Sequence, residues 1–94
     1  MTGSLSLLRR LVDMRQFEAL REACYNLPVI SPAEQVLLAL AQAHLGQPEA
    51  ARQTLAVLVP ATLEVDARVD LAAVHLLLGE LDAAQVLLEA ARTE

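Results

Sequence analysis

Apolar and polar residues in the segment 31–58 follow the period of two amphipathic helices placed back to back. The first helix has a well-marked start. Ser31 offers a hydroxyl for an N-cap, Pro32 suits the first helical position because no N–H is needed there, and Glu34 lies three residues after the cap. These residues predict a helix over 32–45.

The turn after this helix is equally well marked. Gly46 can take the positive φ that ends a helix, and Pro48 can open the next one within two residues. The pattern therefore predicts a second helix over 48–58. Together the two helices form a tight αα-hairpin.

Two further copies of this hairpin can be recognised from the turn. Gly46-Gln-Pro-Glu-Ala-Ala-Arg matches Gly79-Glu-Leu-Asp-Ala-Ala-Gln 33 residues later, and a weaker copy begins at Arg15, 31 residues upstream of Gly46. The repeat predicts an all-α fold of three stacked αα-hairpins in one domain, 1–94. The hairpins span about 4–27, 32–58 and 62–92, with helices over 4–14, 16–27, 32–45, 48–58, 62–78 and 80–92.

Equivalent positions in the three hairpins carry apolar residues. The first helices have Leu7, Leu38 and Leu71, and the second helices have Cys24, Leu55 and Leu88. Turns are predicted at 28–31 and 59–61, where prolines stop or start helices. One hairpin cannot bury its apolar stripe alone, whereas three stacked hairpins can.

Composition supports this reading and limits the function. Of the 94 residues 55% are hydrophobic, mostly Leu and Ala, with one Phe, one Tyr and no Trp. This is more apolar surface than a lone domain of this size hides comfortably. Seven Arg, no Lys and twelve acidic residues give a net charge of −5, which argues against nucleic acid as a partner. The Arg residues are concentrated at the N-terminal end and the acids after it.

The expected compartment is the cytoplasm. The first twelve residues lack a basic region before a long apolar core, so we do not expect a signal peptide. The longest uncharged run, 35–48, is too short to cross a bilayer, so no membrane insertion is expected. A single cysteine, Cys24, permits no internal disulfide and is expected to be an inert core thiol.

Side chains that carry chemistry are sparse. His44, His75 and Cys24 lack the spacing of metal ligands, so neither a metal nor a cofactor is expected. Asp66 and Asp70 lie one helical turn apart, and we interpret them as a solvated face because no base, nucleophile or phosphate loop accompanies them. The protein is therefore not expected to be an enzyme.

The turn motif resembles the tetratricopeptide repeat (TPR) family over nearly the whole chain, with a generic helical array as the alternative. The matching residues are Gly46, Glu49 and Ala51, then Gly79, Asp82 and Ala84, then Phe17 and Glu18, and in the first helices Ala39 and Ala72. The resemblance implies a short right-handed solenoid. One departure is Leu20, which stands where the family places a small residue at the helix crossing.

The resemblance also implies a site. Family members bind ligands with the first helices of their hairpins, which predicts a peptide-binding groove lined by Leu5, Arg9, Val12, Val36, Leu40, Ala43, His44, Val69, Ala73, Leu76 and Leu77. Most of these residues are apolar, so the expected partner is another protein that offers an apolar or amphipathic helix or peptide. His75 is expected to point into the helix packing.

A chaperone-like adaptor, similar in type to the small TPR chaperones of bacterial secretion systems, is the function that this resemblance implies. The alternative is a self-associating scaffold, or a fragment of a longer helical-repeat array. Its support is the segment 81–92, which is apolar almost all round and has no polar capping helix after it. This alternative predicts that the protein forms a homo-oligomer.

Overall fold

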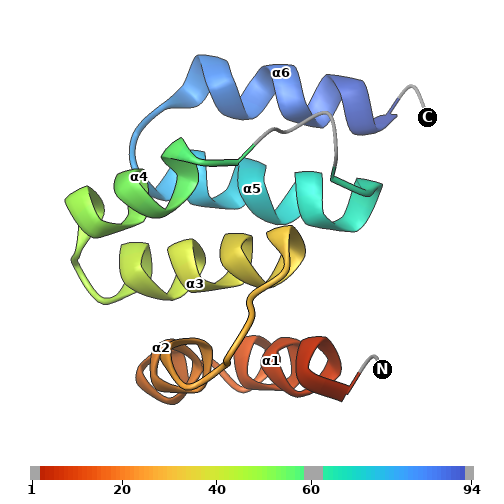
Figure 1. The fold of residues 1–94 in the computed structure, drawn as a ribbon. Coiled ribbons are helices and arrows are strands. Elements are labelled where there is room, and N and C mark those ends of the chain that lie inside the picture. Colours follow the sequence, from red (N-terminus) through yellow and green to blue (C-terminus); the bar gives the residue numbers. More distant parts are fainter. Residues whose placement is uncertain (1–2, 59–62, 93–94) are drawn as a thin grey trace.

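The computed structural model describes residues 3–58 and 63–92, and the regular structure within them is entirely helical (Figure 1). Six helices follow one another as three hairpins, which confirms the predicted architecture. They are α1 (Gly3–Asp13), α2 (Phe17–Tyr25), α3 (Pro32–His44), α4 (Pro48–Ala56), α5 (Val65–Leu77) and α6 (Leu81–Arg92).

Helix ends differ from the prediction by one to three residues. The second helices of the first two hairpins stop two residues early, at Tyr25 and Ala56. A proline follows closely in the first case, and proline disfavours helix in the residue before it. α5 begins at Val65, after the N-cap residue Glu64. The predicted helix start at residue 62 and the predicted turn 59–61 lie outside the described residues.

The start of α3 has the predicted capping box. Ser31 is extended at φ −76° and ψ 162°, and its hydroxyl accepts a hydrogen bond from the backbone N–H of Glu34 at 3.3 Å. In return the backbone N–H of Ser31 donates to Oε1 of Glu34 at 2.9 Å. Two N–H groups that the helix leaves unpaired are thereby satisfied, which fixes where α3 begins.

The three hairpin turns share one backbone conformation. Gly46 and Gly79 adopt positive φ values of 76° and 77°, and Arg15 adopts 56° at the equivalent place in the first hairpin. A side chain is disfavoured in this left-handed region, so glycine suits the second and third turns. The first turn keeps the same geometry without a glycine.

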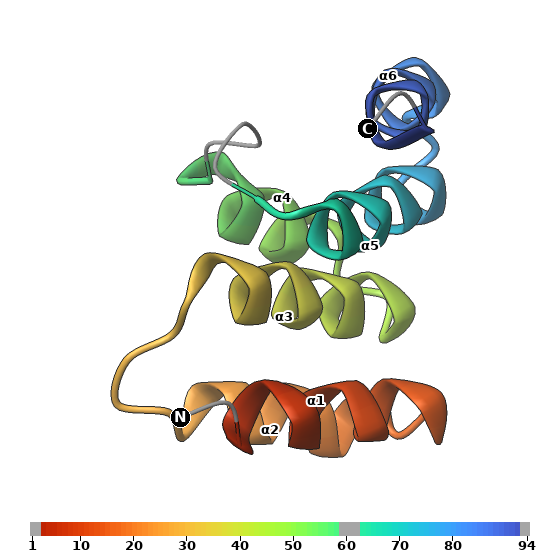
Figure 2. The same cartoon turned by 90° about the vertical axis from the view of Figure 1, so that its right-hand side faces the viewer.

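The hairpins stack with α3 at the centre (Figures 1 and 2). α3 packs against α1 and α2 on one side and against α4 and α5 on the other, whereas α6 packs mainly on α5. The buried residues of α3 therefore point in every direction around its axis; they are Glu34, Val36, Leu37, Ala39, Leu40, Ala41 and Gln42. This helix is the core of the domain.

Small residues mark the helix crossings, as predicted. Ala51 of α4 and Ala84 of α6 are fully buried, and so is Leu20 at the equivalent place in α2. The first helices have a second buried series, formed by Leu8, Ala39 and Ala72. The first hairpin thus accommodates leucine at two places where the others have alanine.

The predicted equivalence of Leu7, Leu38 and Leu71 does not extend to their burial. Leu71 is buried, Leu38 is half-buried and Leu7 is exposed. The difference follows from position in the stack, because α3 and α5 each pack on a preceding hairpin and α1 is in the first one.

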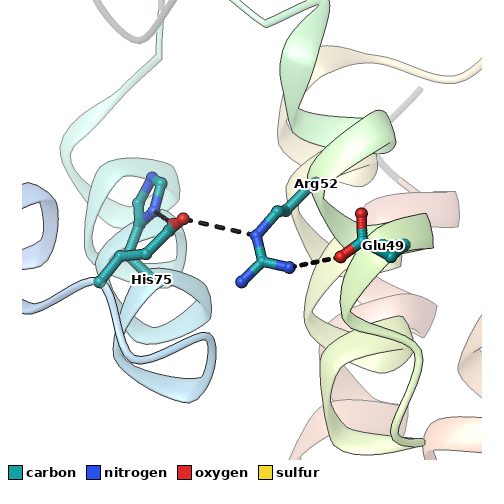
Figure 3. A network of polar contacts seen from close by, with 4 residues as sticks. Glu49, Arg52 and His75 are labelled. Carbon is teal, nitrogen blue, oxygen red and sulfur yellow. Dashed lines mark hydrogen bonds and ion pairs between the residues drawn. The ribbon is translucent and has the colours of Figure 1, made fainter.

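Polar side chains link neighbouring hairpins. The buried Gln42 of α3 donates to the Tyr25 hydroxyl at 3.2 Å and accepts from the Thr54 hydroxyl at 2.7 Å, joining α2, α3 and α4. Between the second and third hairpins, Arg52 lies 3.5 Å from Glu80, which also contacts Nδ1 of His75 at 2.7 Å (Figure 3). These contacts fix the register of adjacent hairpins.

Candidate protein-binding surface

The structure does not form the expected groove at the central hairpin. Val36 and Leu40 are only 0% and 5% exposed, so their assignment to an open groove is wrong. Four helices surround α3, and this packing covers the side from which a ligand would approach. Ala43 is half-buried against the core.

His44 is exposed at the end of α3, and its ring already contacts a residue of the first hairpin. The imidazole stacks on the Phe17 ring of α2, with a distance of 3.9 Å between ring centroids and an angle of 7° between the planes. Burial lowers the pKa of His44, and the nearby Arg15 charge lowers it further. A neutral imidazole stacked on Phe17 fits a packing role.

The N-terminal residues of the expected groove are half-buried, with Leu5 and Val12 packed against the core. Arg9 forms an ion pair with Asp70 of α5, with 2.7 Å between Nη2 and Oδ2. Burial raises the pKa of Asp70, while the Arg9 guanidinium acts in the opposite direction. Asp70 therefore joins α1 to α5, and its interpretation as part of a solvated face is wrong.

A shallow hollow of about 290 Å³ lies beside this pair, where the N-terminal parts of α3 and α5 approach α1. Its lining is mixed, with Leu5 and Leu63 next to Arg9, Glu64 and Asp66. A surface with so many charged groups is a poor match for an apolar partner.

The C-terminal residues of the expected groove are exposed. Val69 and Leu76 are 43% and 49% exposed on one face of α5, and Leu77 is also exposed. Ala73 is half-buried between them. Val69, Leu76 and Leu77 are therefore the large apolar side chains of the expected groove that remain exposed.

Sequence reasoning missed that α6 completes this surface. Leu81 and Leu88 are 64% and 43% exposed and lie on one face of α6, seven residues apart. With Leu76, the buried Ala84 and the polar Gln85 and Glu89 they line an open hollow of about 570 Å³. The signal was present in the apolar character of 81–92 on all sides. We call Val69, Leu76, Leu81 and Leu88 the open end of the stack.

Three of the four positions of the open end are buried or half-buried in the other hairpins; the exception is Leu81, whose equivalent Pro48 is exposed. Leu88 corresponds to Cys24, which is buried, and to Leu55, which is half-buried. Val69 likewise corresponds to Val36 of α3, which is fully buried. The open end is thus the packing surface that one hairpin normally offers to the next.

The histidines and the cysteine are placed apart from one another. His75 contacts Glu80, and Cys24 is buried with its thiol 4.0 Å from the Glu34 carbonyl oxygen. Burial is the main cause that raises the pKa of Cys24 to about 11. Within the described part of the chain, no three His, Cys, Asp or Glu residues are grouped as metal ligands would be. Nor does any described helix have the length and apolar character to cross a membrane.

Three stacked helical hairpins, two of them with a glycine turn and a small crossing residue, define a helical-repeat protein. The tetratricopeptide repeat model matches residues 35–56 and 65–90, which together make up half of the chain, so the chain belongs to the tetratricopeptide repeat family. The matches coincide with the hairpins α3–α4 and α5–α6. The first hairpin, with Arg15 and Leu20 at the places of Gly and Ala, lies outside them.

Repeats of this family generally mediate protein–protein interactions and are typically not enzymes. No curated protein and no solved structure matches this chain.

Proposed function

We propose that this protein is an interaction module that binds the apolar side of a helix, or an apolar peptide, of another protein at its open end. The observation that carries the proposal is the exposure of Val69, Leu76 and Leu88 at positions that are buried or half-buried in the first two hairpins, with the exposed Leu81 beside them. A surface built to receive a helix within the stack has the shape and polarity to receive one from outside.

We propose that the protein performs this function as a chaperone-like adaptor in the bacterial cytoplasm. Its support is the small size, the acidity and the exposed apolar surface of the chain. An exposed apolar surface suits a protein that shields an apolar segment of its partner. If the protein has this role, the captured partner should be a secreted or secretion-associated protein.

The test uses a charge at the centre of the open end. Burying a leucine at an interface is worth about 1.5–3 kcal/mol, so Leu76→Glu is expected to weaken partner binding by at least about tenfold. The fold should persist because half of this side chain is already exposed. Pull-down from a lysate of the source organism compares the wild type with this variant, and circular dichroism checks both.

Val29→Glu is the matched control, since Val29 is 81% exposed in the loop after α2 and away from the open end. It should keep every partner of the wild type. Capture that is unchanged by Leu76→Glu in a folded protein would contradict the proposal. Leu40→Glu is not a useful probe, because Leu40 is buried and its substitution is expected to unfold the domain.

The second candidate function is a self-associating scaffold, or one part of a longer helical array. The open end also favours this candidate, because its natural complement is the first helix of a hairpin. The identity of that helix is a separate question.

A further inference from the structure

The first helix presents the counterpart of the open end. Leu7 and Arg10 lie on one face of α1, and Met14 follows the last residue of this helix; Leu7 and Met14 are 53% and 51% exposed. We call these three residues the start face. The helix α1 lies at the opposite end of the stack from α6 (Figures 1 and 2).

The start face occupies the positions that α3 and α5 use to pack on the preceding hairpin. The equivalents of Arg10 are Ala41 and Val74, which are both fully buried. Two contacts show that this side of α3 faces α2: the Cys24 thiol reaches the Glu34 carbonyl oxygen, and Gln42 bonds to Tyr25. At both internal junctions the first helix of a hairpin packs on the hairpin before it: α3 on α1 and α2, and α5 on α3. The start face and the open end are therefore the surfaces that correspond to the two sides of such a junction.

A polar contact repeats with this interface. Arg21 of α2 donates to Gln47, just after the second turn, at 3.1 Å. Arg52, at the equivalent place in α4, reaches Glu80 just after the third turn. The next pair in the series is Gln85 on α6 and Gln16, just after the first turn. Two glutamine side chains can form the corresponding hydrogen bond between one copy and another.

Charge favours the same pairing. Residues 3–27 contain four Arg and three acidic residues, whereas residues 63–92 contain two Arg and six acidic residues. The start of one molecule and the end of another therefore attract, whereas two open ends would bring acidic hairpins together.

We propose, building on the second candidate function, that the open end receives the start face of a second copy, so that molecules stack head to tail as the internal hairpins do. Such an interface is heterologous, and each added copy presents a fresh open end. The assembly therefore grows with protein concentration instead of closing at a dimer.

The test blocks each half of the interface separately. Leu88→Glu disables the open end and Leu7→Glu disables the start face, while both side chains are exposed enough for the fold to persist. The wild type should show a mass that rises with concentration above the 10.1 kDa monomer in sedimentation equilibrium. Each variant alone should remain monomeric, with self-association weakened at least about tenfold.

An equimolar mixture of the two variants is the decisive sample. The intact start face of Leu88→Glu can dock on the intact open end of Leu7→Glu, so the mixture should form dimers and nothing larger. Leu81→Glu and Met14→Glu serve as second blocks of the two surfaces if circular dichroism shows that either first variant loses helix. Val29→Glu should associate like the wild type.

Three results would overturn the inference: a wild type that stays monomeric, a folded Leu7→Glu that still dimerises, or a mixture that forms no dimer. The second of these would mean that open ends pair with each other. A monomeric wild type whose partner capture is abolished by Leu76→Glu would overturn head-to-tail stacking and leave the proposed function standing.

Discussion

Arg15 holds a left-handed backbone conformation that the other two turns assign to glycine. For a residue with a Cβ this conformation costs about 1–2 kcal/mol of folding free energy. Glycine avoids that cost, but because its unfolded chain is more flexible it costs about 0.5–1 kcal/mol in conformational entropy. Arg15→Gly is therefore expected to stabilise the protein by up to about 1 kcal/mol in urea unfolding.

Arg15→Ala is the control for this prediction, because it removes the charge and keeps the Cβ. It should fall near the wild type. Gly46→Ala should destabilise the second turn by a similar amount, since an added Cβ meets no atom within 4 Å and only the backbone conformation is penalised. Equal stability of the Gly and Ala variants at residue 15 would contradict the argument.

Cys24 lies under α3, and burial raises the pKa of its thiol to about 11. Only the thiolate reacts with disulfide reagents. At pH 8 the lower thiolate fraction alone should slow the reaction about a hundredfold relative to a thiol of pKa 9.0. Reaction with an aromatic disulfide, followed by absorbance, should be slow in the native protein and fast in urea. Rapid native labelling would show that the site opens readily.

At the scale of helices, Ala51 is the residue that sets how closely α4 approaches its neighbours. It is fully buried, so a larger side chain has no space and overpacking is expected to cost about 1–3 kcal/mol. Ala51→Leu should lower the melting temperature by several degrees. Ala56→Leu, on the exposed end of α4, is the control and should have little effect.

The contacts of Glu80 with His75 in its own hairpin and with Arg52 of the second hairpin should respond to pH. The hydrogen bond with His75 is the main cause that lowers the pKa of Glu80, and Arg52 contributes less. The stabilisation is therefore present above the ordinary value of 4.5 and is lost as pH falls through the lower folded value. In an NMR titration, His75→Gln should raise the Glu80 midpoint more than Arg52→Gln does. The opposite order would reassign the main partner.

Local chemistry made the start of α3 and the two glycine turns predictable. The capping box at Ser31 and the glycines at 46 and 79 need only neighbouring residues, and the structure contains all of them as expected. The burial of Val36 and Leu40 was not predictable in this way. It depends on how many helices surround α3, and an apolar stripe has the same appearance whether a ligand or another helix covers it.

The same limit applies to the open end. The sequence of 81–92 shows an apolar helix, but Leu81 and Leu88 become part of one surface with Leu76 only once α5 and α6 are packed together. Asp70 is a similar case, since its partner Arg9 is sixty-one positions away in the sequence. Contacts between hairpins depend on the pitch of the stack, which the 31- and 33-residue spacings leave undetermined.

For the whole molecule, stability should be unevenly distributed, because a stacked array is held together by contacts between neighbours. α3 is enclosed by four helices and α6 is held mainly by α5. Opening α6 alone disrupts mainly its contacts with α5, whereas opening α3 disrupts contacts with four helices and the centre of the core. The two events should therefore differ greatly in free energy.

This difference has a kinetic signature in amide hydrogen exchange. Amides of α6 should exchange through a local opening that requires much less denaturant than global unfolding, whereas those of α3 should exchange only when the whole domain unfolds. Residue-resolved exchange in low urea measures both. Equal opening energies for the two helices would show that the domain unfolds as one unit. If α6 does open first, then the apolar face of α5 that binds Ala84 is transiently exposed, and the protein can exchange its own last helix for that of another molecule.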